Sequence, residues 1–142
     1  MNSSGAEQEI KAAVAGFYAA LNAIFIGDVG PMQEVWSHAG DVTYLGPDGG
    51  FQVGWPEVLA DWQQQAGMKL GGTVRPEGFH VMMGQDLAIV QNYEKGENLN
   101  TGEGPQIVSS RATNLFRKEV GAWKMIGHHT DLLPYLETRF QQ

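Results

Sequence analysis

The last third of the chain alternates apolar and polar residues in a pattern that predicts two paired antiparallel strands. Residues 108–117 and 123–131 interleave large apolar side chains with Arg, Thr, His or Asp, and the short segment between them contains Gly121. Strands that build a plain core seldom carry so many polar groups. The pattern therefore favours a sheet that lines a mainly apolar pocket with a few placed polar side chains.

Helical periodicity is confined to the first half of the chain. Ser4 and Glu7 form a capping box, and the apolar stripe that follows predicts one long helix over residues 5–26. The stripe consists of Ile10, Val14, Phe17, Leu21, Ile24 and Phe25. Two shorter helices are predicted after it, one capped by Asp28 and one that begins near Pro56.

Strand patterns account for most of the remaining chain. Besides the two terminal strands, they cover residues 41–45, 51–53, 73–83 and 87–94, and the polar segment 98–105 is expected to be a loop. Helices gathered on one face of an antiparallel sheet define an α+β fold. With 142 residues and a hydrophobic fraction of 42%, the chain is predicted to form a single domain over residues 1–142.

The composition makes several classes of protein poor candidates. The net charge is −7 at pH 7 and the nine Lys and Arg residues are scattered, so nucleic acids and anionic membranes are poor partners. No run approaches the roughly 18 consecutive apolar residues that cross a bilayer, and the N-terminus does not read as a secretory signal. Cysteine is absent, which excludes disulfides and thiolate ligands. We therefore expect a cytoplasmic protein that binds neither nucleic acid nor membranes.

An ordered set of residues resembles the NTF2-like superfamily and its SnoaL-like branch. The matching features are Phe17-Tyr18-Ala19-Ala20-Leu21-Asn22, Trp36, Gly54-Trp55-Pro56-Glu57-Val58, Arg111-x-Thr113, Gly121-x-Trp123 and His128-His129-Thr130-Asp131. The resemblance covers almost the whole chain. It implies a cystatin-like cone, in which three N-terminal helices pack on a strongly curved mixed, mostly antiparallel sheet. It also implies a homodimer joined through the outer face of that sheet.

The same resemblance leaves two kinds of function open. Relatives include ketosteroid isomerases, dehydratases and polyketide cyclases, which implies a pocket for a small apolar, ring-containing molecule and cofactor-free proton-transfer chemistry. They also include kinase association domains, which implies the alternative of a non-catalytic dimerisation or association module with the same fold. Fold alone does not separate these functions. An open, dry cavity with unpaired polar groups would favour the pocket, and a cone filled by side chains would favour the module.

Three residues are candidates for catalysis by resemblance. His129-Thr130-Asp131 is similar to the His-x-Asp near the end of the last strand in SnoaL-like polyketide cyclases, which implies that Asp131 accepts a proton with His129 as its neighbour. Tyr18 lies on the first helix, where ketosteroid isomerases also carry a tyrosine that donates to a developing oxyanion.

The register of the terminal hairpin decides which polar side chains share a face. If the loop is 119–122, Arg111 lies opposite Thr130, and if the loop is 120–122, Arg111 faces Asp131. A shift of one residue moves every side chain of a strand to the other face of the sheet. We favour the second register because it would pair the two charges, and we expect Arg111 to meet a carbonyl or carboxylate of the ligand.

Further ligand contacts follow from the same reasoning. Thr113 shares a face with Arg111 and would lie opposite His128 in the first register and His129 in the second. Other residues expected to line the pocket are Trp36, Tyr44, Trp55, Tyr93, Glu94 and His128, of which Glu94 enters only if Ala88, Val90 and Asn92 also face inward.

No metal site and no cofactor are expected. His128 and His129 are adjacent on a strand and point to opposite sides, so they cannot bind one ion together. The sequence also contains no His-Glu-x-x-His motif, phosphate-binding loop or dinucleotide fingerprint.

Overall fold

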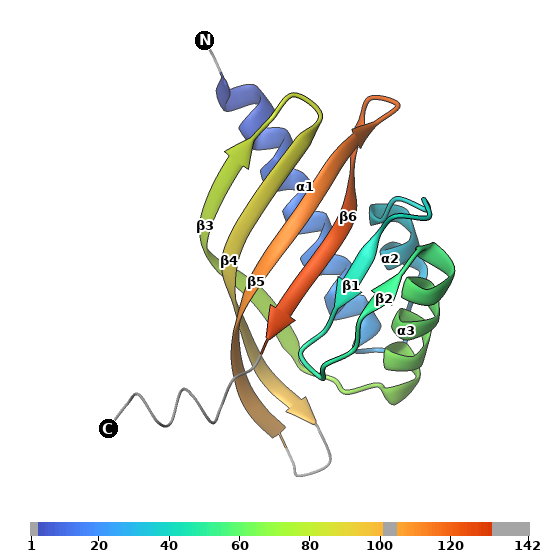
Figure 1. Cartoon of the computed structure of the whole chain (residues 1–142). Coiled ribbons are helices and arrows are strands. Elements are labelled where there is room, and N and C mark those ends of the chain that lie inside the picture. The colour runs from blue at the N-terminus through green and yellow to red at the C-terminus, as the bar shows by residue number, and fades with distance from the viewer. Residues whose placement is uncertain (1–2, 101–104, 132–142) are drawn as a thin grey trace.

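The computed structural model describes residues 3–100 and 105–131. Three helices precede the long strands: α1 (Ser3–Ile24), α2 (Gly30–Val35) and α3 (Trp55–Met68). The long helix α1 runs along one face of the sheet, and α2 and α3 gather beside the short strands at its edge (Figure 1). Of the described helices, none is long and apolar enough to span a membrane.

A single curved sheet forms the other layer. Its strands are β1 (Thr43–Leu45), β2 (Gln52–Val53), β3 (Thr73–Met83), β4 (Leu87–Asn100), β5 (Pro105–Glu119) and β6 (Ala122–Asp131). The spatial order is β2-β1-β6-β5-β4-β3. Only β1 and β6 run parallel, and the other neighbours are antiparallel. The predicted α+β fold, with three helices on a mixed, mostly antiparallel sheet, is confirmed.

The core lies between α1 and the concave face of the sheet. The whole predicted stripe of α1 is buried, from Ile10 to Phe25. Phe17 makes edge-on contacts with Tyr18 and Trp62, whose ring centroids lie 4.9 and 6.2 Å from its own. Burying large aromatic side chains contributes roughly 2–3 kcal/mol each, so this cluster is a main source of stability.

The segment 98–105 is not simply a loop. Strand β4 continues to Asn100 and β5 begins at Pro105, with residues 101–104 outside the described part of the chain. Leu99 is buried and pairs with the β5 backbone after a register shift that follows Gly96. The apolar side chain of Leu99 thus keeps this polar segment in the sheet.

The terminal hairpin combines a tight turn with a β-bulge. Val120 and Gly121 form a two-residue connection, and both have positive φ angles of 50° and 78°. Leu115 then pairs with Gly127 while Phe116 pairs with Met125, so one extra residue of β6 is inserted between those pairs. The bulge restores the favoured register, in which Arg111 lies opposite Asp131, although the connection is shorter than either predicted loop.

Candidate functional site

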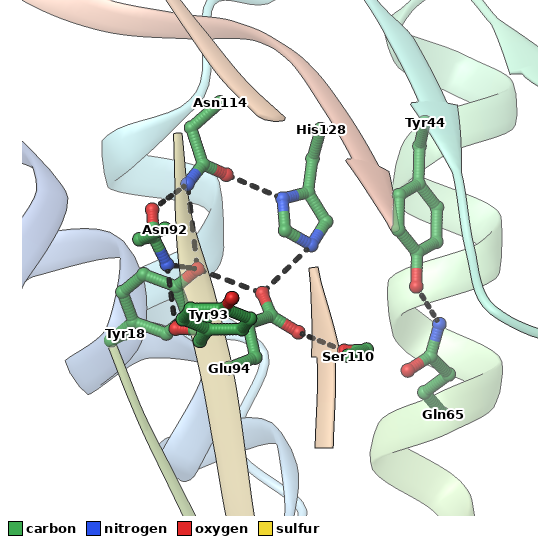
Figure 2. Close-up of polar contacts among 9 residues, drawn as sticks. All are labelled: Tyr18, Tyr44, Gln65, Asn92, Tyr93, Glu94, Ser110, Asn114 and His128. Carbon is green, nitrogen blue, oxygen red and sulfur yellow. Dashed lines mark hydrogen bonds and ion pairs between the residues drawn. The ribbon is translucent and has the colours of Figure 1, made fainter. Parts of the chain in front are cut away.

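Polar side chains from three neighbouring strands gather on the inward face of the sheet. Ala88 and Val90 are buried on β4, and the alternation of side chains along the strand sends Asn92 and Glu94 to the same side. Strands β5 and β6 contribute Ser110, Asn114, His128 and Thr130, all of them buried. Tyr18 reaches this group from α1 (Figure 2).

A chain of hydrogen bonds connects the members of this group other than Thr130. The Tyr18 hydroxyl donates to Glu94 Oε2 at 2.8 Å and accepts from Asn92 Nδ2 at 2.9 Å. Asn114 Nδ2 donates to Asn92 Oδ1 at 3.0 Å. The Ser110 hydroxyl makes a longer contact, 3.4 Å, with Glu94 Oε1. Glu94 Oε2 is therefore committed to protein contacts, and Oε1 is the less tightly held carboxyl oxygen.

The contact between His128 and Asn114 shows which ring nitrogen of His128 carries the proton. Nδ1 of His128 lies 2.6 Å from Asn114 Oδ1, and an amide oxygen can only accept, so Nδ1 carries a proton. Nε2 lies 3.3 Å from Glu94 Oε2. In the neutral imidazole Nε2 is an acceptor, so a protonated Glu94 can donate to it.

Burial perturbs the pKa values of both groups. Removal from water raises the pKa of Glu94 to about 7, and the hydrogen bonds from Tyr18 and Ser110 only partly oppose this rise. Burial lowers the pKa of His128 to about 3. Burial and the nearby Glu94 charge keep the pKa of Tyr18 well above its ordinary value. At neutral pH, Glu94 is therefore near half-protonation while His128 and Tyr18 are neutral.

A cavity of about 210 Å³ lies beside the network. Glu94, Ser110, His128 and Thr130 belong to its lining, and most of the remaining wall is apolar, including Trp62 of α3. Tyr18 contacts Glu94 but is not among the described residues of the lining. A pocket of this kind, apolar with a few convergent polar groups and a perturbed carboxyl, is a typical ligand site.

Tyr44 is the fourth predicted residue at this site, after Tyr18, Glu94 and His128. It lines the cavity and stacks on Trp62 with ring centroids 4.5 Å apart. Its hydroxyl accepts from Gln65 Nε2 at 2.9 Å (Figure 2). Burial raises the pKa of Tyr44, so this hydroxyl stays protonated.

The two predicted tryptophan contacts lie elsewhere. Trp36 and Trp55 are buried, but neither belongs to the described lining of the cavity. Trp36 forms an isolated parallel bridge with Met125, and Trp55 stacks on His38 with ring centroids 4.3 Å apart. Both act as core residues at the β1–β2 end of the molecule, which corrects the expectation that they face the ligand.

The expectation that Arg111 and Asp131 face the cavity is also wrong. Both side chains are exposed, because the inward positions of β5 and β6 are taken by their sequence neighbours. The side chains of His129 and Asp131 are each about half exposed and meet one another, with Nε2 and Oδ2 2.8 Å apart. From the outer face these two groups cannot reach the cavity on the inner side of the sheet.

Thr113 and Tyr93 lie on the same outer face as Arg111. The three residues line a second, shallow hollow of about 440 Å³ over β3, β4 and β5. Apart from Trp36 and Trp55, the predicted ligand contacts therefore lie in two sets on opposite faces of one sheet. The polar residues that sequence reasoning did not select are Gln65, Asn92, Ser110, Asn114 and Thr130.

No metal centre is evident in the described part of the chain. No three His, Asp or Glu side chains lie close enough together there to hold an ion. The chemistry that this arrangement supports directly is the binding and release of a proton at Glu94.

Comparisons with known proteins place this cone in a defined class. Solved structures with the NTF2-like fold superpose on nearly the whole chain. A candidate dehydratase of the NTF2-like family from Streptomyces avermitilis is 20% identical, with a TM-score of 0.80, covering 94% of this chain and 99% of that one. An NTF2-like superfamily protein from Salmonella enterica is 13% identical, with a TM-score of 0.77 and coverage of 94% and 96%. The molecule is thus an NTF2-like fold protein.

The family assignment is more specific. The model of the SnoaL-like domain matches residues 10–133, so the chain belongs to the SnoaL-like family. A candidate calcium/calmodulin-dependent protein kinase type II association domain from Thiobacillus denitrificans is 27% identical, with a TM-score of 0.72, and the match covers 87% of this chain and 94% of that one. A comparison with curated proteins found no match.

Proposed function

We propose that this protein binds a small apolar molecule in the cavity of its cone and that Glu94 exchanges a proton with the bound compound. The observation that carries the proposal is a buried carboxyl on the wall of an apolar cavity, with a pKa of about 7. A general acid or base works best when its pKa lies near the operating pH. The SnoaL-like family membership is consistent with such a site.

The surrounding residues act through Glu94. In its ionised form, Glu94 accepts a proton from a carbon next to a carbonyl, and it can return that proton to a different carbon or to a leaving oxygen. Such steps underlie isomerisation, cyclisation and dehydration. Because the Tyr18 hydroxyl donates to Oε2, Tyr18 stabilises the carboxylate rather than contacting the ligand. The lone pair of His128 Nε2 can accept a hydrogen bond from Oε2 when Glu94 is protonated, which stabilises the acid form of Glu94.

Hydrogen exchange on a simple ketone tests this proposal. The methyl protons of acetophenone are followed by NMR in D₂O near neutral pD, with and without the protein. We expect faster exchange with wild type and at least a hundredfold loss of the acceleration in Glu94→Gln. The matched control is Asp131→Asn on the outer face, which should keep the acceleration. Loss in Asp131→Asn with retention in Glu94→Gln would refute the assignment of Glu94.

An association module is the second candidate, and two observations favour it. Similarity extends to an association domain at 27% identity, and the outer face of the sheet exposes large apolar side chains, including Tyr93 at 49% and Met82 at 40%. A second copy of the chain could cover this face and form a homodimer. Sedimentation of wild type and of a Met82→Asp, Tyr93→Asp variant tests this, because a dimer that persists in the variant contradicts the outer-face interface.

A further inference from the structure

The orientation of the Asn92 side-chain amide is set by a backbone carbonyl. Nδ2 of Asn92 lies 3.0 Å from the carbonyl oxygen of Tyr93. A carbonyl oxygen can only accept a hydrogen bond, so Asn92 must turn its NH₂ group toward Tyr93. The same NH₂ group donates to the Tyr18 hydroxyl. The amide oxygen of Asn92 is therefore left to face Asn114 (Figure 2).

This orientation is passed on to Asn114 and then to His128. Because Asn92 Oδ1 is an acceptor, Asn114 turns its Nδ2 toward it, and the two atoms lie 3.0 Å apart. Asn114 Oδ1 then faces Nδ1 of His128 at 2.6 Å. His128 is thus held with its proton on Nδ1 and with the lone pair of Nε2 toward Glu94 Oε2, 3.3 Å away. Asn114 is fully buried and His128 nearly so, which keeps bulk water from competing for these contacts.

The Asn92 amide also sets the direction of the hydrogen bond from Tyr18. The Tyr18 oxygen accepts from Asn92, so its own hydrogen is donated to Glu94 Oε2. Oε2 therefore faces one donor, the Tyr18 hydroxyl, and one acceptor, Nε2 of His128. A carboxylate oxygen can satisfy only the donor, whereas a protonated Oε2 can accept from Tyr18 and donate to His128 at the same time.

We propose that Asn92 and Asn114 are positioning residues, which fix the Nδ1-protonated tautomer of His128. Through this tautomer they hold the acid proton of Glu94 on Oε2 and leave Oε1 as the carboxyl oxygen that meets the ligand. Neither asparagine belongs to the described lining of the cavity, so both act through other side chains. This inference rests on the proposed function, since it concerns proton exchange at the same carboxyl.

Nitrogen-15 NMR of the protein labelled at histidine reads the tautomer directly, because protonated and unprotonated ring nitrogens resonate far apart. The spectrum is recorded at pH 7.5 without ligand, and the His128 signals are assigned by their loss in His128→Gln. We expect His128 of the wild type to carry its only ring proton on Nδ1. A proton on Nε2 alone, or on both nitrogens, would overturn the inference whatever the behaviour of any other variant.

Asn114→Leu tests the role of the amide. Leucine has a similar size but cannot accept from Nδ1, so the proton of His128 should move to Nε2 and be donated to Glu94 Oε2. A donor then replaces an acceptor beside the carboxyl, and the pKa of Glu94 should fall by about one pH unit or more. The matched control is Val90→Ala. Val90 is fully buried and pairs with Asn114 across β4 and β5, so this change loosens the same part of the core but keeps both amides. It should keep the wild-type tautomer.

The outcomes separate this inference from the proposed function. An unchanged tautomer in Asn114→Leu, or the same change of tautomer in Val90→Ala, would overturn the assignment of Asn114. These spectra involve no ligand, whereas failure of the proposed function would appear as no acceleration of acetophenone exchange by the wild type. If the wild type accelerates exchange, the pH at which the rate reaches half its maximum should be lower in Asn114→Leu. An unchanged pH profile would overturn the link between Asn114 and Glu94.

Discussion

Replacement of Glu94 by glutamine should make the protein more resistant to unfolding at alkaline pH. The folded protein holds the proton of Glu94 up to about pH 7, whereas the ordinary pKa is 4.5. Each pH unit between the two values is worth about 1.4 kcal/mol, so the full difference is about 3 kcal/mol. The stability contributed by the protonated form is complete below pH 4.5 and is lost as the pH rises through 7. The uncharged amide of glutamine avoids this loss.

Urea denaturation at several pH values measures this effect. The stability of Glu94→Gln relative to wild type should rise by about 2.5 kcal/mol between pH 5 and pH 8. His128 contributes the opposite slope, since its pKa of about 3 means stability is lost as the pH falls below 6.5. Subtracting wild type from the variant isolates the contribution of Glu94. The control Glu97→Gln alters an exposed residue of the same strand and should show a constant difference. A constant difference for Glu94→Gln as well would refute the reasoning.

Three further outcomes are expected. Val120→Asn should raise the melting temperature by a few degrees, because Val120 is a β-branched residue with a φ of 50° in a turn that favours asparagine; a lower melting temperature would contradict this. Tyr18→Phe should raise the pKa of Glu94 further, as seen by NMR, and cost about 1–2 kcal/mol, because a hydrogen bond to the carboxylate is lost and Asn92 Nδ2 keeps only one of its two acceptors, the carbonyl oxygen of Tyr93. Arg117→Gln should cost about 1 kcal/mol or less in urea denaturation, and less in high salt, because its bridge to Asp41 is largely exposed; equal loss at all salt concentrations would argue against an ionic contribution.

The long helix could be predicted from the sequence because its apolar residues follow the helical repeat. The stripe from Ile10 to Phe25 has the helical period and no competing strand pattern, and every predicted residue of it is buried. Long strands with alternating side chains are equally clear. The extension of β4 to Asn100 is less visible, because the polar side chains around Leu99 have the composition of a loop.

The pairing of the terminal hairpin could be predicted, but its inward face could not. Met125 is fully buried, and uninterrupted alternation from it would send His129 and Asp131 inward as well. The bulge inserts one residue and brings His128 to the inside instead. Gly127 directly follows Ile126, and a glycine inside a strand often marks a bulge, but the glycine alone does not show which residue is inserted.

The amide side chains of the network were missed for a related reason. Asn92 and Asn114 have the composition of solvent-exposed or turn positions, and only the fold brings them to Tyr18. The one sequence signal is their spacing from apolar neighbours such as Val90 and Ala112, which share the inward face. This spacing identifies the two asparagines as inward-facing only when it is known which face of β4 and β5 packs against α1.

A site-specific titration of Glu94 tests the central claim most directly. The side-chain carboxyl is labelled with carbon-13, its resonance is assigned by its loss in Glu94→Gln, and its chemical shift is followed from pH 3 to pH 9. A midpoint near pH 7 is predicted, because the carboxyl is buried beside the cavity. A midpoint near 4.5, the ordinary value for this side chain, would contradict the claim that burial beside the cavity raises the pKa of Glu94.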